Sequence, residues 1–507
     1  MLLDLARPGQ LALALGPDIV LLVGAMVLLL IAVARPDSDE HQRAVGIGAI
    51  AVCVLTIAAI LFYVGFGLEA TPGMVAVDVF RWSADVIFLL GAILALAMSI
   101  DYERRQGIVL AESHVMVLLA TSGMMLLGAA RDLILVFLGI ELMSVAVYVL
   151  SGLNRRSAAA AEAALKYFLL GAFSTGFLLY GIALVYGATG STNLGAIGSW
   201  VARNGAMHSP MLLVGMGLLI VGFGFKVAAV PFHMYTPDVY EGAPTPYTAY
   251  MAAAVKAAAF AAFLRVWLEA FNNAGEAWHG ALWGLALATM IVGNVVALAQ
   301  RNIKRLLAYS SVAHAGYLLV AVVVGTTAGA SAFVFYLLAY TLATMGAFAV
   351  VAAVAHTGER HIDLRDFDGL WRVRPWTAVA MAVFMLALLG FPIVGGMGFF
   401  AKWYILLAAL RAPTPEVTLA VVVVLTSVVS AGYYLAVVMN MFMRSRPATA
   451  PEPGRVPRVT GVVIAVTAVL LLVFGIYPNP IARLVPSTTP ATAAGPAPGT
   501  LAATARR

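Results

Sequence analysis

The sequence predicts an all-α fold in which about fourteen helices cross a membrane. Composition is the first reason: of 507 residues, 62% are hydrophobic and only 11% are charged, whereas soluble proteins carry about 25% charged residues. Continuous apolar runs of about 20 residues are the second reason, because a helix of that length spans a bilayer. The third is that the arginines gather in alternate loops between these runs. The predicted class is therefore a polytopic helical membrane protein.

Fourteen apolar runs can be placed along the chain. They lie near residues 17–34, 44–66, 79–99, 112–129, 132–151, 163–187, 211–230, 244–270, 280–299, 303–326, 330–355, 376–410, 416–442 and 459–478. The first ten residues carry charges of both signs and no small-residue cleavage site follows them, so we expect the first run to remain in the mature protein.

The basic residues between the runs predict the orientation of the chain. With the N-terminus outside and the spans alternating, the inner loops hold seventeen basic residues and the outer segments seven. The inner residues are Arg35, Arg43, Arg104, Arg105, Arg155, Arg156, Arg301, Lys304, Arg305, Arg360, Arg365, Arg372, Arg374, Arg444, Arg446, Arg455 and Arg458. The outer residues are Arg7, Arg131, Arg203, Arg411, Arg483, Arg506 and Arg507. Because basic loops stay on the cytoplasmic side, both termini are expected on the non-cytoplasmic side.

Glycine and proline interrupt the seventh and the twelfth spans. Gly222 and Pro231 flank Lys226 in the seventh span, and Pro392 precedes Lys402, among several glycines, in the twelfth. Proline removes a helical hydrogen bond and glycine weakens a helix. Backbone freed in this way is tolerated in a membrane only inside protein or beside a water-filled cavity. Interrupted helices in corresponding positions of two halves indicate inverted repeats around an ion site.

These features predict the domain organisation. An N-terminal three-helix segment covers residues 1–111 and is followed by two halves of five helices each, at 112–270 and 280–442. A last helix lies at 459–478. Residues 479–507 are rich in Pro, Ala and Thr and are expected to be a disordered tail. The two halves are expected to be inverted copies of one another.

Four ionisable side chains lie near the middle of apolar spans: Glu141, Lys226, Lys256 and Lys402. A charge at the bilayer centre costs at least about 2.5–3.5 kcal/mol, so such residues mark functional sites by default. Burial disfavours the charged form of an amine and a nearby carboxylate favours it, so this set is suited to proton transfer. A lysine close to a helix end often only reaches the headgroups, but these four lie far from the expected ends.

Other polar residues are open to two interpretations. His314, among small polar residues of the tenth span, is either a packing hydrogen-bond donor or a proton relay. Lys166 follows Glu162 by four residues, the spacing of an ordinary ion pair on a helix surface; the alternative is that the pair feeds a proton path. Arg81 and Asp85 have the positions of an interfacial ion pair near the outer end of the third span.

No cofactor or metal is expected in this chain. Cys53 is the single cysteine and the eight histidines are scattered, which argues against metal and iron–sulfur sites. The glycine-rich run near Gly395 lies within a membrane span and does not follow a strand, so it does not match a nucleotide-binding loop.

Several motifs resemble the antiporter-like membrane subunits of respiratory complex I (NADH–quinone oxidoreductase) and of Mrp-type cation/proton antiporters. The motifs are FKVAAVPFHMYTPDVYEGAPTPYTAYMAAAVKAAAF, GIELMS, RNIKRLLAYSSVAHAGY, DLRDFDGLWRVRP and GFPIVGGMGFFAKWYIL, within about residues 112–445. The chain has HMYTPDVY where the L and M classes of the family typically show a WLPDAM-type loop. It also has Lys402 where the M class carries a glutamate, and it lacks the long lateral helix of the L class after residue 478. These departures favour the N class.

The resemblance implies roles for the candidate residues. Glu141 and Lys226 would form a charge pair between the fifth and seventh helices. Lys256 would be the central lysine of the eighth helix and Lys402 the terminal lysine of the twelfth. His314 would help to connect them along a hydrated axis at the membrane midplane. The implied activity is proton translocation.

The same resemblance implies partners and cofactors elsewhere. NADH oxidation and quinone reduction, with FMN and iron–sulfur clusters, would occur in other subunits. The membrane neighbours would be the antiporter-like M subunit and the small K and J subunits, in the lipid bilayer of a bacterial inner membrane; nucleic acid is not an expected partner. Two alternative functions remain: an Mrp-type cation/proton antiporter subunit, and a structural membrane subunit whose charges only hold helices together.

Overall fold

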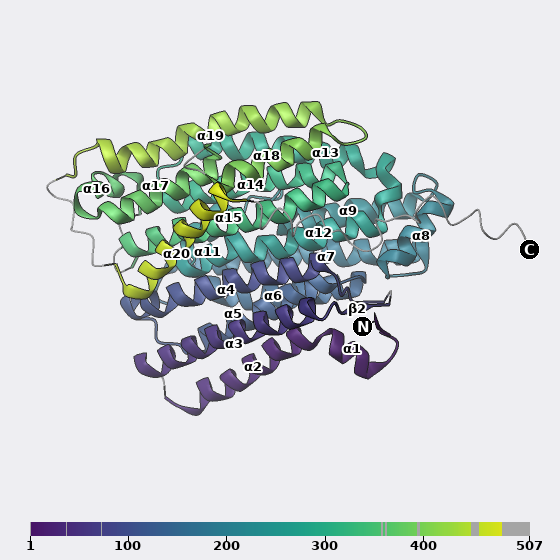
Figure 1. Ribbon diagram of the computed structural model, residues 1–507, viewed down its shortest axis with the longest axis horizontal. Helices are drawn as coiled ribbons and strands as arrows, with labels where there is room; N and C mark the ends of the chain where they lie inside the picture. Colours follow the sequence, from purple (N-terminus) through teal and green to yellow (C-terminus); the bar gives the residue numbers. More distant parts are fainter. Residues whose placement is uncertain are drawn as a thin grey trace, which may run out of the picture.

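The chain forms a bundle of long helices, most of them aligned with one another (Figure 1). The computed structural model describes residues 2–36, 38–71, 73–355, 358–359, 362–392, 396–447 and 456–478. Within these ranges, twelve helices are long and apolar enough to cross a membrane. The predicted class, an all-α polytopic membrane protein, is confirmed. The expected disordered tail at 479–507 lies outside the described residues.

The N-terminal segment contains three long helices and a small end structure. The elements are β1 (Leu2–Leu3), α1 (Pro8–Ala14), α2 (Gly16–Ala34), α3 (Asp39–Gly65), β2 (Glu69–Ala70) and α4 (Val79–Gln106). The two short strands pair in parallel. Polar caps determine where the long helices begin, because Ser38 and Asp78 accept the first free N–H groups of α3 and α4.

The next elements cover the first predicted half. They are α5 (Glu112–Ala129), α6 (Leu133–Ser151), α7 (Ala158–Thr189), α8 (Leu194–Asn204), α9 (Pro210–Lys226), α10 (Thr236–Gly242), α11 (Thr245–Tyr250) and α12 (Lys256–Ala270). A π-helical turn, Met251–Val255, joins α11 to α12 without a break. The inverted relation between the two halves remains a prediction.

The remaining elements cover the second predicted half and the last helix. They are α13 (Gly275–Leu298), α14 (Ile303–Val324), α15 (Thr327–Val354), α16 (Leu370–Val373), α17 (Pro375–Leu389), α18 (Met397–Leu410), α19 (Val417–Met443) and α20 (Arg458–Ile476). Short 3₁₀ turns lie at Asn272–Ala274 and Leu364–Phe367.

Both predicted interruptions are present. In the seventh span α9 stops at Lys226 and the chain resumes as α10 at Thr236. In the twelfth span α17 stops at Leu389, where Gly390 takes the left-handed conformation (φ 77°) that ends a helix. The two interrupted spans therefore consist of shorter helices. Together with the twelve long helices they account for the fourteen predicted crossings.

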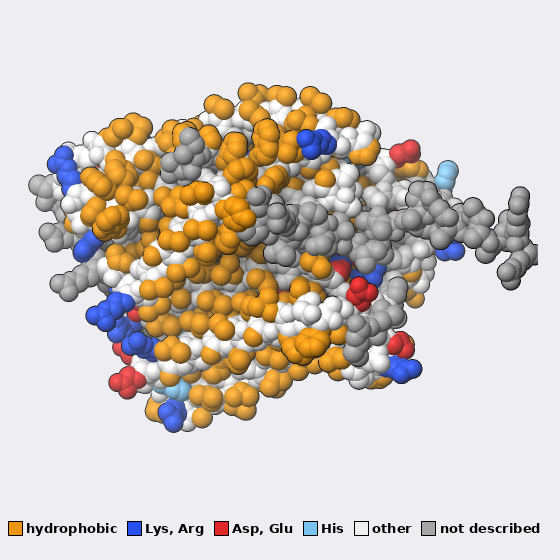
Figure 2. Space-filling view, in the orientation of Figure 1, with side chains coloured by type: hydrophobic (Ala, Val, Ile, Leu, Met, Phe, Trp, Pro, Cys, Tyr) orange, Lys and Arg blue, Asp and Glu red, His pale blue; other side chains and the backbone are white. Residues whose placement is uncertain are grey.

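Burial divides the helices into a core and a covering layer. The span that contains α12 is wholly buried and α14 and α15 are nearly so, whereas α2, α3, α19 and α20 turn most of their residues outward. Figure 2 shows the matching surface: apolar side chains cover the middle of the molecule and charged ones gather towards its two ends. Of the ionisable residues described next, Lys256 and His314 lie on the core helices α12 and α14.

Candidate functional site

Lys226 ends α9 and lies inside the protein, with 5% of its surface exposed. Its ammonium donates to Ser144 Oγ at 2.8 Å and to Tyr148 OH at 3.4 Å. Both acceptors belong to α6, as does Glu141, one helical turn before Ser144. Within the described residues Glu141 and Lys226 form no direct ion pair. The structure thus brings them to neighbouring positions with the Ser144 hydroxyl as the direct partner of the lysine.

Lys256 is the first residue after the π-helical turn and is 3% exposed. Its ammonium donates to the Ser311 carbonyl at 3.0 Å and also bonds the Ser311 hydroxyl. Ser311 is on α14, one turn before His314. π-helical turns are rare overall but frequent at functional sites, and this one directly precedes Lys256.

His314 joins α14 to two other helices. Its Nδ1 lies 2.6 Å from Tyr336 OH of α15, and its Nε2 lies 3.0 Å from Tyr434 OH of α19. The Tyr434 hydroxyl also bonds Ser310 Oγ. Both ring nitrogens are therefore engaged by hydroxyl groups, which can each give and accept a proton.

Lys402 lies on α18 and is 7% exposed. Its ammonium donates to the Leu389 carbonyl at 2.8 Å and to Ser427 Oγ at 3.1 Å. It also lies 4.7 Å from the centre of the Tyr317 ring, within the range of a cation–π contact. A cavity of about 10 Å³ is lined by both Lys402 and His314. A space of that size is just enough for one water molecule.

A second hydrogen-bonded path lies beside His314. Tyr433 OH of α19 donates to Asn294 Oδ1 of α13 at 3.0 Å, and Asn294 Nδ2 donates to Tyr317 OH at 3.1 Å. These side chains were not singled out from the sequence. The only signal was their polarity within apolar runs, and a single tyrosine in a membrane helix is too common to be distinctive.

Lys166 is apart from this group, at the surface. Its side chain is 40% exposed and pairs with Glu162 at 2.6 Å and with Asp238 at 2.7 Å. Asp238 also accepts from Arg305 at 2.9 Å. Burial acts to raise the pKa of Asp238, but the hydrogen bonds from Lys166 and Arg305 outweigh it and lower that pKa. The predicted ion pair of Glu162 and Lys166 on the helix surface is thus present, and Lys166 also pairs with Asp238.

The predicted ion pair of Arg81 and Asp85 is present near the start of α4, and it is buried inside the protein. Both side chains are fully buried, 3.4 Å apart, and Arg81 also bonds Asp18 of α2. The bond to Asp18 at the start of α2 is a contact that hydropathy alone does not reveal.

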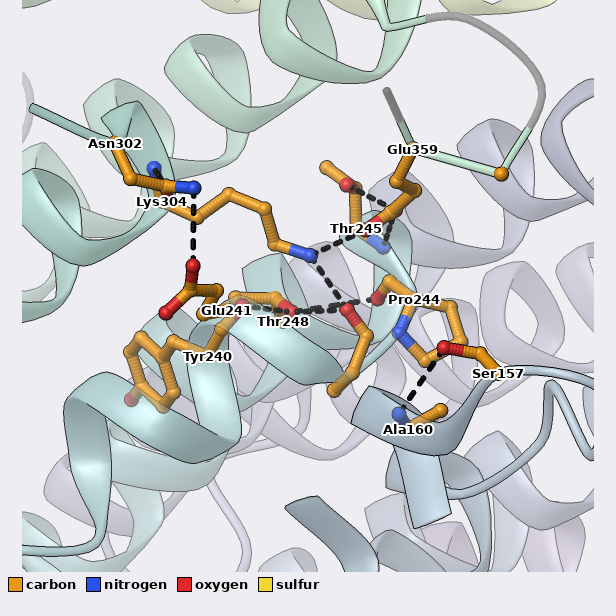
Figure 3. A network of polar contacts seen from close by, with 12 residues as sticks. Ser157, Ala160, Tyr240, Glu241, Pro244, Thr245, Thr248, Asn302, Lys304 and Glu359 are labelled. Carbon is orange, nitrogen blue, oxygen red and sulfur yellow. Dashed lines mark hydrogen bonds and ion pairs between the residues drawn. The ribbon is translucent and has the colours of Figure 1, made fainter. Parts of the chain in front are cut away.

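A buried pair near the ends of α11 and α14 was also missed. Lys304 is completely buried and bonds Glu359 Oε2 at 2.6 Å (Figure 3). Burial acts to raise the pKa of Glu359, but Lys304 outweighs it and lowers that pKa. Lys304 was counted only as an inner-loop charge. Its partner is distant in sequence, so no local pattern indicates the pair.

Among the described residues, no group of three His, Cys, Asp or Glu side chains has the arrangement of a metal site. Lys226, Lys256 and Lys402 bond hydroxyl and carbonyl oxygens, which accept hydrogen bonds from an ammonium. The arrangement is suited to exchanging protons between buried groups.

Comparison with known proteins gives the family. The profile of the family described as "NADH:quinone oxidoreductase/Mrp antiporter, TM" matches residues 130–430. NADH-quinone oxidoreductase subunit N of Gemmatimonas aurantiaca is 53% identical over 499 residues, covering 96% of this chain and 95% of that protein. A chain of respiratory complex I from Thermus thermophilus, solved with bound aureothin, is 37% identical with a TM-score of 0.78, covering 93% of this chain and 100% of that one.

A chain of the Mrp complex from Dietzia sp. has a TM-score of 0.78 at 21% identity, over 94% of this chain and 97% of that one. At this identity the likeness is one of fold. The helices and the buried lysines define an antiporter-like membrane subunit. The chain belongs to the NADH:quinone oxidoreductase/Mrp antiporter family and, within it, groups with the N subunits of NADH-quinone oxidoreductase. The resemblance seen in the sequence motifs is confirmed.

Proposed function

We propose that this chain is the proton-translocating N-type membrane subunit of a bacterial NADH-quinone oxidoreductase. Its similarity to N subunits extends over nearly the whole chain, and its fold is that of a complex I membrane subunit. NADH oxidation and quinone reduction, with FMN and iron–sulfur clusters, take place in partner subunits. The adjoining membrane partners are the M subunit and the small K and J subunits.

Protons pass through Glu141, Lys226, Lys256, His314 and Lys402. The observation that carries this proposal is the run of polar contacts from Lys256 through α14 to Lys402. Ser311 bonds Lys256, His314 lies one turn further along the same helix, and one cavity touches both His314 and Lys402. Hydroxyl groups and single waters can both relay protons between such sites.

The bonding of the lysines supports transfer over a structural role. Burying an unpaired ammonium costs several kcal/mol, and neither Lys256 nor Lys402 has a carboxylate within 4 Å among the described residues. Their charged forms are therefore held only by neutral groups: hydroxyl and carbonyl oxygens and, for Lys402, the Tyr317 ring. A purely structural charge in a membrane would instead be paired, as Lys304 is with Glu359.

We propose Lys166 as an entry point for protons, because its ion pair with Asp238 joins α7 to α10 at this end of the bundle. For the orientation, we propose that this end faces the cytoplasm and that both termini lie outside. The abundance of basic residues in the loops of this end supports the assignment.

The test replaces single lysines in the assembled complex. Lys256→Met and Lys402→Met keep the side-chain length but remove the amine. NADH-driven proton uptake into inverted membrane vesicles should fall at least tenfold, while NADH oxidation with a water-soluble acceptor, which reports assembly, stays normal. Arg411→Met, at an exposed position of the opposite end, is the control. Normal proton uptake in both lysine variants would refute the proposed path.

A further inference from the structure

Glu359 connects three separate parts of the bundle at one point. It lies in the connection between α15 and α16, and its carboxylate accepts from the Thr245 backbone N–H at 2.8 Å and the Thr245 hydroxyl at 2.5 Å. It also bonds Lys304 Nζ at 2.6 Å and the hydroxyl of Tyr102 from α4. Figure 3 shows Lys304 and Thr245 converging on this carboxylate from different helices.

The backbone at Glu359 is held in an unusual conformation. Its φ is 51°, in the left-handed region that residues with a Cβ rarely adopt, and it follows Gly358 at φ 76°. Such backbone strain persists only where surrounding contacts maintain it, and it often occurs at functional sites. Here the bent connection turns the carboxylate inward, where its side chain is only 14% exposed.

Glu359 joins α11 to α14. Lys256 lies on the continuation of α11, and its partner Ser311 lies on α14. Thr245 begins α11, which continues through the π-helical turn to Lys256. Lys304 lies in the first turn of α14, and Ser311, the partner of Lys256, is two turns further along. The same pair of helices is therefore connected twice: at the end by Glu359, and in the interior by the bond between Lys256 and Ser311.

The π-helical turn Met251–Val255 lies between these two connections. A π turn contains one residue more than an α turn, and one residue corresponds to a rotation of about 100° in an α-helix. If the turn relaxed to α geometry while the end of α11 was free to rotate, Lys256 would turn away from Ser311. A fixed end at Thr245 prevents that rotation.

Lys304 strengthens the same connection. Besides Glu359 it bonds the Ala243 carbonyl at 2.6 Å, which closes the short link between α10 and α11. That carbonyl also accepts from the Thr248 hydroxyl at 3.1 Å. The start of α11 is thus contacted by both members of one buried ion pair: Glu359 bonds Thr245, and Lys304 bonds the Ala243 carbonyl just before it.

We propose that Glu359 is a positioning residue for Lys256: by holding Thr245 and Lys304 together it maintains the π-helical turn and keeps the amine of Lys256 on Ser311. Glu359 does not itself carry the proton. The functional part of the inference rests on the proposed proton path through Lys256. The structural part, which is that Glu359 stabilises the π turn, is independent of that proton path.

The experiment uses the assembled complex with Glu359→Gln, which keeps the acceptor oxygen for Thr245 but loses the charge facing Lys304. Hydrogen–deuterium exchange of peptides covering residues 251–256 should become at least fivefold faster. NADH-driven proton uptake should fall by half or more. Glu359→Asp, which keeps the charge, should restore at least half of both losses.

The matched control is Glu416→Gln, which removes a carboxylate from the ion pair with His279, 2.7 Å away, between α13 and α19. Neither of these helices contains Lys256 or Ser311, so exchange at 251–256 should be unchanged. Unchanged exchange in Glu359→Gln, or faster exchange with full proton uptake, would overturn the proposal.

If Glu359→Gln does not assemble, Thr245→Val decides the question in the same two measurements, because it removes one hydroxyl and preserves the ion pair. It should accelerate exchange two- to threefold. Full proton uptake in Lys256→Met would refute the proposed proton path, while the exchange result would still report on the role of Glu359 in the π turn.

Discussion

Single buried charges in this protein are of two kinds, distinguished by their partners. Arg265 of α12 is paired with Asp78 at 2.8 Å and Glu269 at 3.0 Å, so its charge is compensated. Lys256 and Lys402, in contrast, bond only hydroxyl and carbonyl oxygens. Removing one member of a compensated pair leaves a buried charge and costs about 3–5 kcal/mol. The first kind therefore stabilises helix contacts, and the second is free to change its protonation.

The hydroxyl of Tyr434 is expected to matter because it joins His314 to Ser310. Tyr434→Phe keeps the ring but removes the group that bonds both partners. A buried polar group left without its partner costs about 1–3 kcal/mol, so we expect proton uptake to decrease two- to tenfold with normal assembly. Proton uptake by inverted vesicles measures this.

Tyr477→Phe, at an exposed tyrosine, serves as the control for the loss of a hydroxyl. An unchanged rate in Tyr434→Phe would mean that the contact with Tyr434 is not part of the path between His314 and Lys402.

Asp238 is expected to stabilise the protein without dependence on pH in the physiological range. Its pKa in the folded protein is below the ordinary value of 3.8, so its contribution is present above about pH 3.8 and is lost only as the pH falls through the lowered value. Asp238→Asn should therefore lower thermal stability equally at pH 5.5 and pH 8. The side chain is 35% exposed, so the loss should be at most about 1 kcal/mol.

Differential scanning fluorimetry of the purified complex at the two pH values measures this loss. It should shrink in 1 M salt, where charges at the surface are screened. Glu162→Gln is the comparison, since it affects only the more exposed contact to Lys166. A loss that appeared only at pH 8 would contradict the assignment.

At the level of helices, the interrupted spans bring the lysines and backbone carbonyls together. Because α17 ends there, the Leu389 carbonyl has no partner within the helix. The ammonium of Lys402 on α18 donates a hydrogen bond to this carbonyl. This arrangement requires close contact of the two half-helices. Gly398 provides that contact, because a Cβ there would lie 1.9 Å from the Ala387 carbonyl oxygen.

Gly398→Ala should therefore separate α17 from α18 and displace Lys402 from the Leu389 carbonyl. We expect lower thermal stability by about 2 kcal/mol or more, of the order found when a core is overpacked, together with reduced proton uptake. Gly217→Ala is the matched control, since it lies in helix α9 with no atom within 4 Å of the added Cβ. Equal behaviour of the two variants would show that this helix contact does not position Lys402.

The same level shows what sequence patterns can and cannot predict. Apolar length placed the fourteen spans, though not the short helices outside them, such as α1, α8 and α16, and glycine with proline placed both interruptions, because these signals are local. The π-helical turn before Lys256 was not predicted. Its sequence, MAAAV, has no feature that separates it from an α-helix, and the contacts that accompany it come from distant residues such as Glu359.

For the whole molecule, the two ends of the bundle differ. In Figure 1, α1 and α8 lie towards one end and α16 towards the other. The ion pairs of Lys166, Asp238 and Arg305 gather at the α16 end, with many of the basic loops. The predicted orientation assigns this end to the cytoplasm.

The orientation can be tested by labelling single introduced cysteines. The native Cys53 is buried, so it gives little background. Arg155→Cys and Arg203→Cys place a thiol at exposed positions of opposite ends. In inverted vesicles a membrane-impermeant maleimide should label Arg155→Cys and not Arg203→Cys, and the reverse is expected in right-side-out vesicles. The opposite pattern would reverse the orientation.

The sequence by itself determined the class of the protein, the number of crossings, the interrupted helices and three of the buried lysines, Lys226, Lys256 and Lys402, but not Lys304. These features depend on hydropathy, charge and helix-breaking residues, which act within about one helix length. The tertiary structure decided what each charge contacts. It placed Ser144 against Lys226, Ser311 against Lys256 and Glu359 against Lys304. Such pairings join residues far apart in the chain, and only packing brings them within hydrogen-bonding distance.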